Sequence, residues 1–201
     1  WLREHVPTDP RARLGLSDDA AVVSLAGRGE IVVTTDLLTD AVDFQLGTHA
    51  PQRVGRQALA ANLSDLAAMA TKPLAAFLSI ALPRNGAANL SALELAKQLY
   101  EGVLPLAAEY EVAIAGGDTN TYDGPLVLSI TALGLSTGRG PLLRSAGKPG
   151  DWLLVTGALG AQSASASGNP LVEALGDSSA AKVVKYIGLA GLVASFFSII
   201  Y

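Results

Sequence analysis

Cysteine is absent from the 201 residues of this sequence. Disulfide bonds, thiolate zinc sites and cysteine nucleophiles are therefore excluded within it. Histidine is scarce as well, because His5 and His49 are too few for a histidine-rich metal site, and no motif pairs either of them with a nucleophilic serine. The chemistry of this chain therefore has to come from other side chains.

The sequence also lacks an excess of basic residues. Its formal net charge of -4 provides no basic surface for a phosphodiester backbone, so we expect no binding to nucleic acid. The first residues, WLREHVPTDP, show no signal-peptide pattern, and we expect a cytoplasmic protein. The uncharged segment 186–201 is shorter than the roughly 20 residues of a membrane span. We interpret it as a buried helix or strand and expect no membrane association.

Short β-prone runs alternate with longer helical patterns, which predicts a mixed α+β or α/β domain. We expect a hairpin of strands over 20–25 and 31–35, then helices over 51–70 and 91–110. Ser91 and Glu94 have the spacing of a capping box. The remaining predicted strands cover residues 73–83, 111–115, 125–136 and 152–156.

A segment rich in glycine, proline and basic residues, 138–151, marks a change along the chain. We place a domain boundary there, with an N-terminal domain over 1–146 and the start of an α/β C-terminal domain over 147–201. The second domain is expected to be incomplete within this sequence, because its Gly/Ser/Ala-rich tract has little pattern.

Several carboxylates lie at the ends or edges of apolar elements, where acidic side chains are seldom buried without partners. They are Asp18, Asp19, Asp36, Asp65 and Asp118. Each one alone is explained by a turn, a cap or a solvated position. Together, with threonines nearby, they are typical of oxygen ligands for Mg²⁺. If the strands before Asp36 and Asp118 are neighbours, their ends share one edge of a sheet that the helix carrying Asp65 crosses.

The motif IAGGDTNTYDG, residues 114–124, is predicted to be a strand that ends in two glycines before Asp118. Glycines at a strand end let a ligand approach the main chain. A tight turn with an aspartate cap is the alternative interpretation. A site with several carboxylates and magnesium ions suits a polyphosphate, and the sequence has no Walker A motif or kinase glycine-rich loop.

Five motifs, in order over about residues 14–160, resemble the thiamine-monophosphate kinase family. They are SDDAAVV, TTDLLTDAVDF, GRQALAANLSDLAAMATKP, IAGGDTNTYDGPLVLSITALG and PLLRSAGKPGDWLLVTGALG. The family belongs to the superfamily of aminoimidazole ribonucleotide synthetase, selenophosphate synthetase and the hydrogenase maturation factor HypE. The resemblance implies a mixed α+β N-terminal domain that dimerises through its sheet, and ATP held by Mg²⁺. The implied reaction is transfer of the γ-phosphoryl group of ATP to thiamine monophosphate.

The resemblance also implies roles for individual residues. The implied magnesium ligands are Asp19, Thr34, Thr35, Asp36, Asp65 and Asp118. Gly117, Asp118 and Arg144 match nucleotide-contacting positions, with Asp118 and Arg144 as the expected catalytic residues. Tyr100 either approaches the nucleotide or packs its helix.

The sequence departs from the family pattern at three places. Ser17 replaces a glycine, Asp43 replaces a histidine that contacts the substrate, and a C-terminal DISDGL motif is absent, for which Asp177 is no convincing substitute. Asp43 repels a substrate phosphate and attracts a cationic thiazolium. Two alternatives therefore stay open: another ATP-dependent enzyme of the superfamily with a different acceptor, and a non-catalytic nucleotide-binding or dimerising module.

Overall fold

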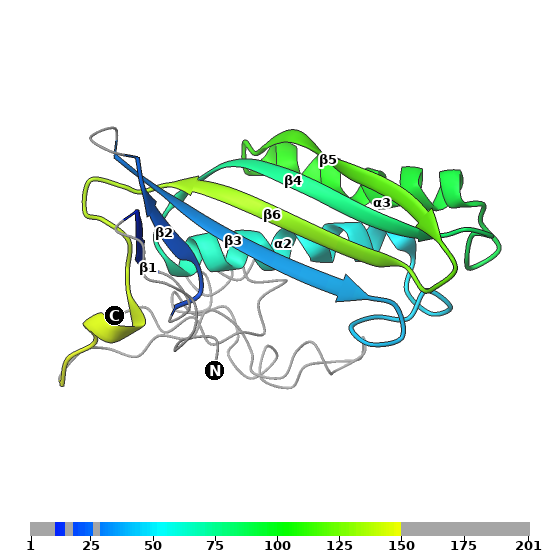
Figure 1. Cartoon of the computed structure of the whole chain (residues 1–201), viewed down its shortest axis with the longest axis horizontal. Coiled ribbons are helices and arrows are strands. Elements are labelled where there is room, and N and C mark those ends of the chain that lie inside the picture. The colour runs from blue at the N-terminus through cyan, green and yellow to red at the C-terminus, as the bar shows by residue number, and fades with distance from the viewer. Residues whose placement is uncertain (1–10, 15–17, 26–28, 150–201) are drawn as a thin grey trace, which may run out of the picture. The chain divides into compact units, whose positions relative to one another are not determined.

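The computed structural model describes residues 11–14, 18–25 and 29–149. Within them the chain forms one six-stranded sheet and two long helices, so the predicted mixed α+β architecture is confirmed (Figure 1). The elements are β1 (Ala12–Leu14), β2 (Ala21–Ser24), β3 (Glu30–Thr39), α2 (Pro51–Ala68), β4 (Lys72–Pro83), α3 (Ala92–Glu109), β5 (Ala113–Tyr122), β6 (Val127–Leu135) and the short 3-10 helix η1 (Arg144–Ala146).

The chain divides into two compact units, residues 1–141 and 142–201. Residues 142–149, with η1, are the described part of the second unit. The strand predicted over 152–156, the apolar segment 186–201 and Asp177 lie outside the described residues, and the boundary near residue 147 stays a prediction. In the described part of the chain, no helix combines the length and apolar character needed to cross a membrane.

The sheet has the strand order β1-β2-β3-β6-β4-β5. The hairpin predicted at its start is confirmed, because β2 and β3 pair antiparallel from Ala21 with Val33 to Ser24 with Glu30. Strand β6 is antiparallel to both β3 and β4, while β4 and β5 are parallel. It follows that β3, β4 and β5 all run in the same direction.

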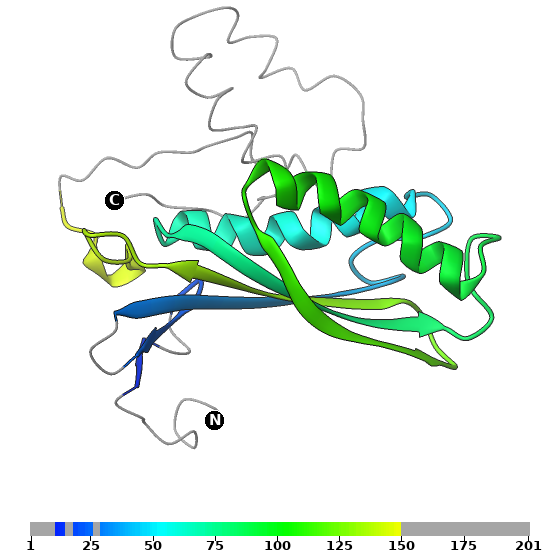
Figure 2. The same ribbon diagram turned by 90° about the horizontal axis from the view of Figure 1, so that it is seen from above.

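Both helices cover one face of this sheet (Figure 2). Alternate residues of β6, namely Leu128, Ile130 and Ala132, are fully buried on that face. This alternation has the period of two expected for a sheet with one covered face. The hydrophobic core therefore lies between the sheet and the helices, and the opposite face is open among the described elements.

The helix boundaries follow the local signals in the sequence. Helix α2 begins at Pro51, which needs no amide hydrogen bond in the first turn. Helix α3 begins after Ser91, and the capping box with Glu94 is present. The two helices approach closely because Gly102 has no side chain: a Cβ atom there would lie 1.8 Å from the carbonyl oxygen of Gln52.

Strand β5 corrects the interpretation of the glycine pair. The prediction that the strand ends at Gly116 and Gly117 is wrong. The strand continues through both glycines to Tyr122. Ala76 pairs with Ile114 and Phe77 with Gly116, so Ala115 is an extra residue that forms a β-bulge. Both glycines have positive φ, 155° and 149°. The glycines therefore allow the bulged backbone to pack against β4.

Candidate functional site

The centre of the candidate site is a hydrogen bond between β3 and α2. The Thr34 hydroxyl donates to Oδ2 of Asp65 over 2.6 Å. Thr34 is on the helix-covered face of β3, where it is 5% exposed, and Asp65 is on the face of α2 that packs over this strand. The predicted packing of the Asp65 helix across the sheet is therefore confirmed at Thr34.

The carboxylates of Asp36 and Asp65 share this poorly solvated region. Burial raises the pKa of Asp65 to about 6, opposed by the hydrogen bond from Thr34 and reinforced by the negative charge of Asp36. Burial also raises the pKa of Asp36. Desolvation and like charge both disfavour ionised carboxylates, so this pair is a place where a cation is stabilising. We call Thr34, Asp36 and Asp65 the β3–α2 cluster.

Asn62 adds an unusual polar atom next to this cluster. It lies three residues before Asp65 on α2 and is completely buried. Its Nδ2 donates to the carbonyl oxygen of Ala58 over 3.1 Å, but its Oδ1 has no hydrogen-bond partner. A buried acceptor without a donor is rare in a folded protein. The two carboxylates and the hydroxyl of the cluster are a donor set that fits hard Mg²⁺, and Asn62 adds an acceptor without a partner on the same helix.

Asp19 lies close to the same segment of β3 along the sheet. It is two residues before Ala21, whose partner is Val33, so the chain enters β2 beside the stretch that carries Thr34 and Asp36. The preceding residue, Asp18, accepts a hydrogen bond from the Asp19 amide over 3.0 Å. This is the local turn that the sequence interpretation kept as an alternative for this pair.

Thr35 points away from the cluster. Its hydroxyl donates to the carbonyl oxygen of Ile130 over 3.2 Å and is 3.0 Å from the hydroxyl of Thr131. Thr35 alternates with Thr34 along β3 and therefore belongs to the open face of the sheet. Of the two predicted threonine ligands, the structure brings only Thr34 to the carboxylates.

Asp118 lies on the opposite face as well. The register aligns Asp118 with Ser79 of β4, Ser129 of β6 and Leu37 of β3, a row of exposed or half-exposed residues. Asp36 belongs to the adjacent row, which ends at Gly117. Strands β3 and β5 are not neighbours, because β6 and β4 lie between them, and three strand spacings amount to roughly 14 Å.

The described part of one chain therefore gathers only a portion of the predicted metal ligands. Among these residues, no group of three or more His, Cys, Asp or Glu side chains is arranged to hold a metal ion. The Asp118 carboxylate instead accepts a hydrogen bond from the Thr119 amide over 2.9 Å. The role predicted for Asp118 stays a prediction, because Asp118 lies on the open face of the sheet and Asp65 lies over the helix-covered face.

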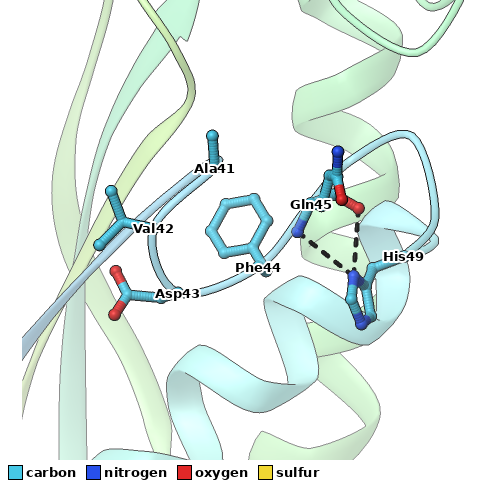
Figure 3. Close-up of a pocket in the computed structure, with 6 residues that line it drawn as sticks. All are labelled: Ala41, Val42, Asp43, Phe44, Gln45 and His49. Carbon is cyan, nitrogen blue, oxygen red and sulfur yellow. Dashed lines mark hydrogen bonds between the residues drawn. The ribbon is translucent and has the colours of Figure 1, made fainter. Parts of the chain in front are cut away.

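A pocket of about 310 Å³ lies in the loop between β3 and α2. Its lining residues are Ala41, Val42, Asp43, Phe44, Gln45 and His49 (Figure 3). Oδ2 of Asp43 accepts a hydrogen bond from the Thr39 amide over 2.8 Å. On the other side of the Phe44 ring, Nδ1 of His49 is 3.2 Å from the Gln45 amide nitrogen. The sequence interpretation missed His49 here, although its position six residues after Asp43 in one loop was a signal.

The AIR synthase related protein, N-terminal domain family matches residues 17–136. The chain belongs to this family. The matched range contains every predicted site residue except Arg144, and it includes the whole β3–α2 cluster.

Individual relatives agree with this assignment to the AIR synthase related family. The chain is 42% identical over 167 residues to the thiamine-monophosphate kinase of Rhodopirellula baltica, covering 80% of this chain and 51% of that protein. The crystal structure of the thiamine-monophosphate kinase from Stenotrophomonas maltophilia K279a is 36% identical, with a TM-score of 0.50, covering 70% of this chain and 42% of that chain. The chain spans about half the length of the curated relatives that it matches.

A more distant structure shows the same AIR synthase related fold. AaThiL complexed with AMPPCP and TMP is 23% identical to this chain, with a TM-score of 0.64. The match covers 86% of this chain and 57% of that chain.

Three further predicted residues of this family member occupy separate places. Gly117 pairs with Leu78 at the edge of the sheet. Tyr100 is half-buried on α3, which packs against α2, β4 and β5 rather than at the β3–α2 cluster. Arg144 is exposed in η1 of the second unit. Their predicted contacts with a nucleotide stay predictions.

Proposed function

We propose that this protein takes part in Mg²⁺-dependent transfer of the γ-phosphoryl group of ATP to thiamine monophosphate, which forms thiamine diphosphate. The β3–α2 cluster is the observation that carries the proposal, since it places two destabilised carboxylates and a hydroxyl together. The relatives named thiamine-monophosphate kinase, and the AaThiL complex with AMPPCP and TMP, support the choice of substrates. An ATP-dependent reaction also agrees with the expected cytoplasmic location.

Four residues of this chain would hold the metal. Asp36 and Asp65 would supply carboxylate oxygens, Thr34 would fix the orientation of Asp65 through its hydrogen bond, and Asp19, two residues before β2, would supply a third carboxylate. Bound Mg²⁺ supplies charge neutralisation for the polyphosphate of ATP. The residues fit this ion because all of their donor atoms are oxygens.

The proposed reaction does not require a general base from the protein. A phosphate monoester oxygen is already anionic near neutral pH, which agrees with a chain that has only two histidines. The protein's task is then to position two anions and to shield their charges. Arg144, a guanidinium that can bind phosphate oxygens through two parallel hydrogen bonds, is the proposed cationic partner of the transferred group.

A homodimer would explain why Asp118 lies on the open face of the sheet. That face carries large exposed apolar side chains, including Leu37 (62% exposed), Phe77 and Leu135. Apolar faces of this kind commonly form interfaces. In the proposed dimer a second copy covers this face, so that Asp118 lies at the interface. Sedimentation velocity is expected to show a dimer at micromolar concentration, and a strictly monomeric chain would contradict this part of the proposal.

Asp43 is the residue that bears on which acceptor the reaction uses, thiamine monophosphate or the alternative, a different acceptor. Its carboxylate lines the loop pocket at the position where the kinase pattern has a histidine. Because one of its oxygens is bound to the Thr39 amide, Asp43 has a fixed place in that pocket. A negative charge held there suits the cationic ring of thiamine monophosphate and opposes an acceptor that is only anionic.

The acceptor is tested by calorimetric titration of thiamine monophosphate into the protein saturated with Mg²⁺ and AMPPCP. We expect binding that depends on the nucleotide analogue and that weakens about tenfold in Asp43→Asn, because the attraction to the thiazolium charge is lost. If AMPPCP binds and thiamine monophosphate does not, the alternative acceptor would be favoured.

A further inference from the structure

The buried carboxamide of Asn62 has one satisfied half and one unsatisfied half. Its Nδ2 donates to the Ala58 carbonyl oxygen over 3.1 Å, whereas Oδ1 has no partner. The assignment of the two amide atoms follows from this contact, because exchanging them would place two acceptors against each other. The unpartnered atom is therefore an acceptor, and only a donor can satisfy it.

From the ordinary rise of a helix and a strand we infer that Asn62 lies on the Asp36 side of Thr34 along β3. Helix α2 runs in the opposite direction to β3 (Figure 1), and Asp65 is fixed at the level of Thr34 by their hydrogen bond. The step from Asp65 back to Asn62 is about 4.5 Å along the axis of α2. Two residues forward along a strand, from Thr34 to Asp36, is about 6.6 Å. The side chains of Asn62 and Asp65 are also neighbours on one face of α2.

None of the cluster residues can donate a hydrogen bond to this oxygen. Ionised Asp36 and Asp65 are acceptors only. The single hydroxyl proton of Thr34 is already used in the bond to Asp65. The cluster therefore supplies no donor for this oxygen, and a water molecule can provide one. A water molecule bound to a cation has two protons to donate while its oxygen faces the metal.

We propose that Asn62 is a positioning residue of the metal site, and that its Oδ1 accepts a hydrogen bond from a water molecule bound to the Mg²⁺ held by Asp36 and Asp65. This inference rests on the proposed function, because it requires that the β3–α2 cluster binds the ion. Residues that hydrogen-bond to the ligands of a metal orient those ligands and change the affinity of the site for the metal. Asn62 thereby fixes which coordination positions remain for the nucleotide.

The test compares Mg²⁺ binding and stability in Asn62→Leu, measured by calorimetric titration with MgCl₂ and by thermal unfolding in EDTA. Leucine has a similar size and removes the unpaired acceptor, so the melting temperature in EDTA should be equal to or above that of the unchanged protein. The dissociation constant for Mg²⁺ should rise about 10- to 100-fold. Thr71→Val is the matched control. The buried Thr71 hydroxyl donates a hydrogen bond to the carbonyl oxygen of Leu66 on α2, the helix that also carries Asn62. This variant also removes a buried polar group, and it should leave Mg²⁺ affinity unchanged.

The outcomes separate this inference from the proposed function. If the unchanged protein does not bind Mg²⁺, the proposed metal site fails. If it binds Mg²⁺ and Asn62→Leu binds it equally well, only the role of Asn62 fails. Should Asn62→Leu not fold, Asn62→Asp keeps the acceptor and adds a charge, so Mg²⁺ must raise its melting temperature more than that of the unchanged protein. A smaller rise would overturn the inference.

Discussion

Replacing Asp65 with asparagine is expected to stabilise the metal-free protein at pH 7 and to abolish its response to Mg²⁺. The pKa of Asp65 is raised to about 6 by burial and by the charge of Asp36. The folded state therefore disfavours the ionised form that exists at neutral pH. Asparagine removes this charge and keeps an oxygen that can accept the hydrogen bond from Thr34.

The direction of the pH dependence follows from the two states of the chain. Between about pH 4 and pH 6 the unfolded chain ionises Asp65 while the folded chain keeps it protonated, so stability falls as the pH rises. Above pH 6 the folded state bears the full cost of holding Asp65 ionised, which is about 1–2 kcal/mol after allowance for solvent screening. The free energy of unfolding of Asp65→Asn should therefore exceed that of the unchanged protein by about that amount at pH 7 and by almost nothing at pH 4.

Urea denaturation in EDTA at both pH values measures this difference. Asp123→Asn is the matched control, since this exposed carboxylate pairs with Arg84 over 3.0 Å and its loss should change stability by less than about 0.5 kcal/mol. Excess Mg²⁺ should then raise the stability of the unchanged protein and leave that of Asp65→Asn unaffected. A loss of stability in Asp65→Asn at pH 7 would contradict the electrostatic account of the cluster.

Replacing Gly117 with alanine is expected to destabilise the protein by about 3 kcal/mol or more. A Cβ atom at this position would lie 1.7 Å from the Leu78 carbonyl oxygen, and φ is +149°. Relief of this overlap requires β5 to move away from β4, which breaks backbone hydrogen bonds at the edge of the sheet. Chemical denaturation of Gly117→Ala measures the loss of free energy.

The neighbouring glycine provides a matched comparison. At Gly116 a Cβ atom would meet only the Phe77 ring, at 3.6 Å, so Gly116→Ala retains the strain of its positive φ without the collision. We expect a cost of about 1–2 kcal/mol for this variant. Equal losses in the two variants would show that the close approach of β5 to β4 is not what requires Gly117.

Local signals in the sequence were sufficient to predict most elements of the fold. Pro51 and the Ser91 capping box correctly placed the starts of both helices, and the short loop between two β-prone runs correctly predicted the hairpin. The glycine pair was misinterpreted because glycine commonly marks the end of a strand. Here it allows a strand to continue past a bulge, which depends on the neighbouring strand and not on local preference.

The candidate site was only partly predictable for a related reason. The contact between β3 and α2 at Asp65 followed from the packing of a helix against the strand before it. The position of Asp118 did not, because β6 and β4 are inserted between β3 and β5 and the bulge shifts the register of β5. The unpaired oxygen of Asn62 was also beyond sequence reasoning, since it depends on which donors surround it in three dimensions.

Binding of a metal-bound nucleotide by the β3–α2 cluster can be measured by calorimetric titration of AMPPCP into the protein. The titration is made at pH 7 in Mg²⁺ and repeated in EDTA. We expect stoichiometric binding in Mg²⁺ that is lost in EDTA and in Asp65→Asn. Binding of equal affinity in Mg²⁺, in EDTA and in Asp65→Asn would contradict this expectation, because the nucleotide would then be bound without the ion or the carboxylates of the cluster.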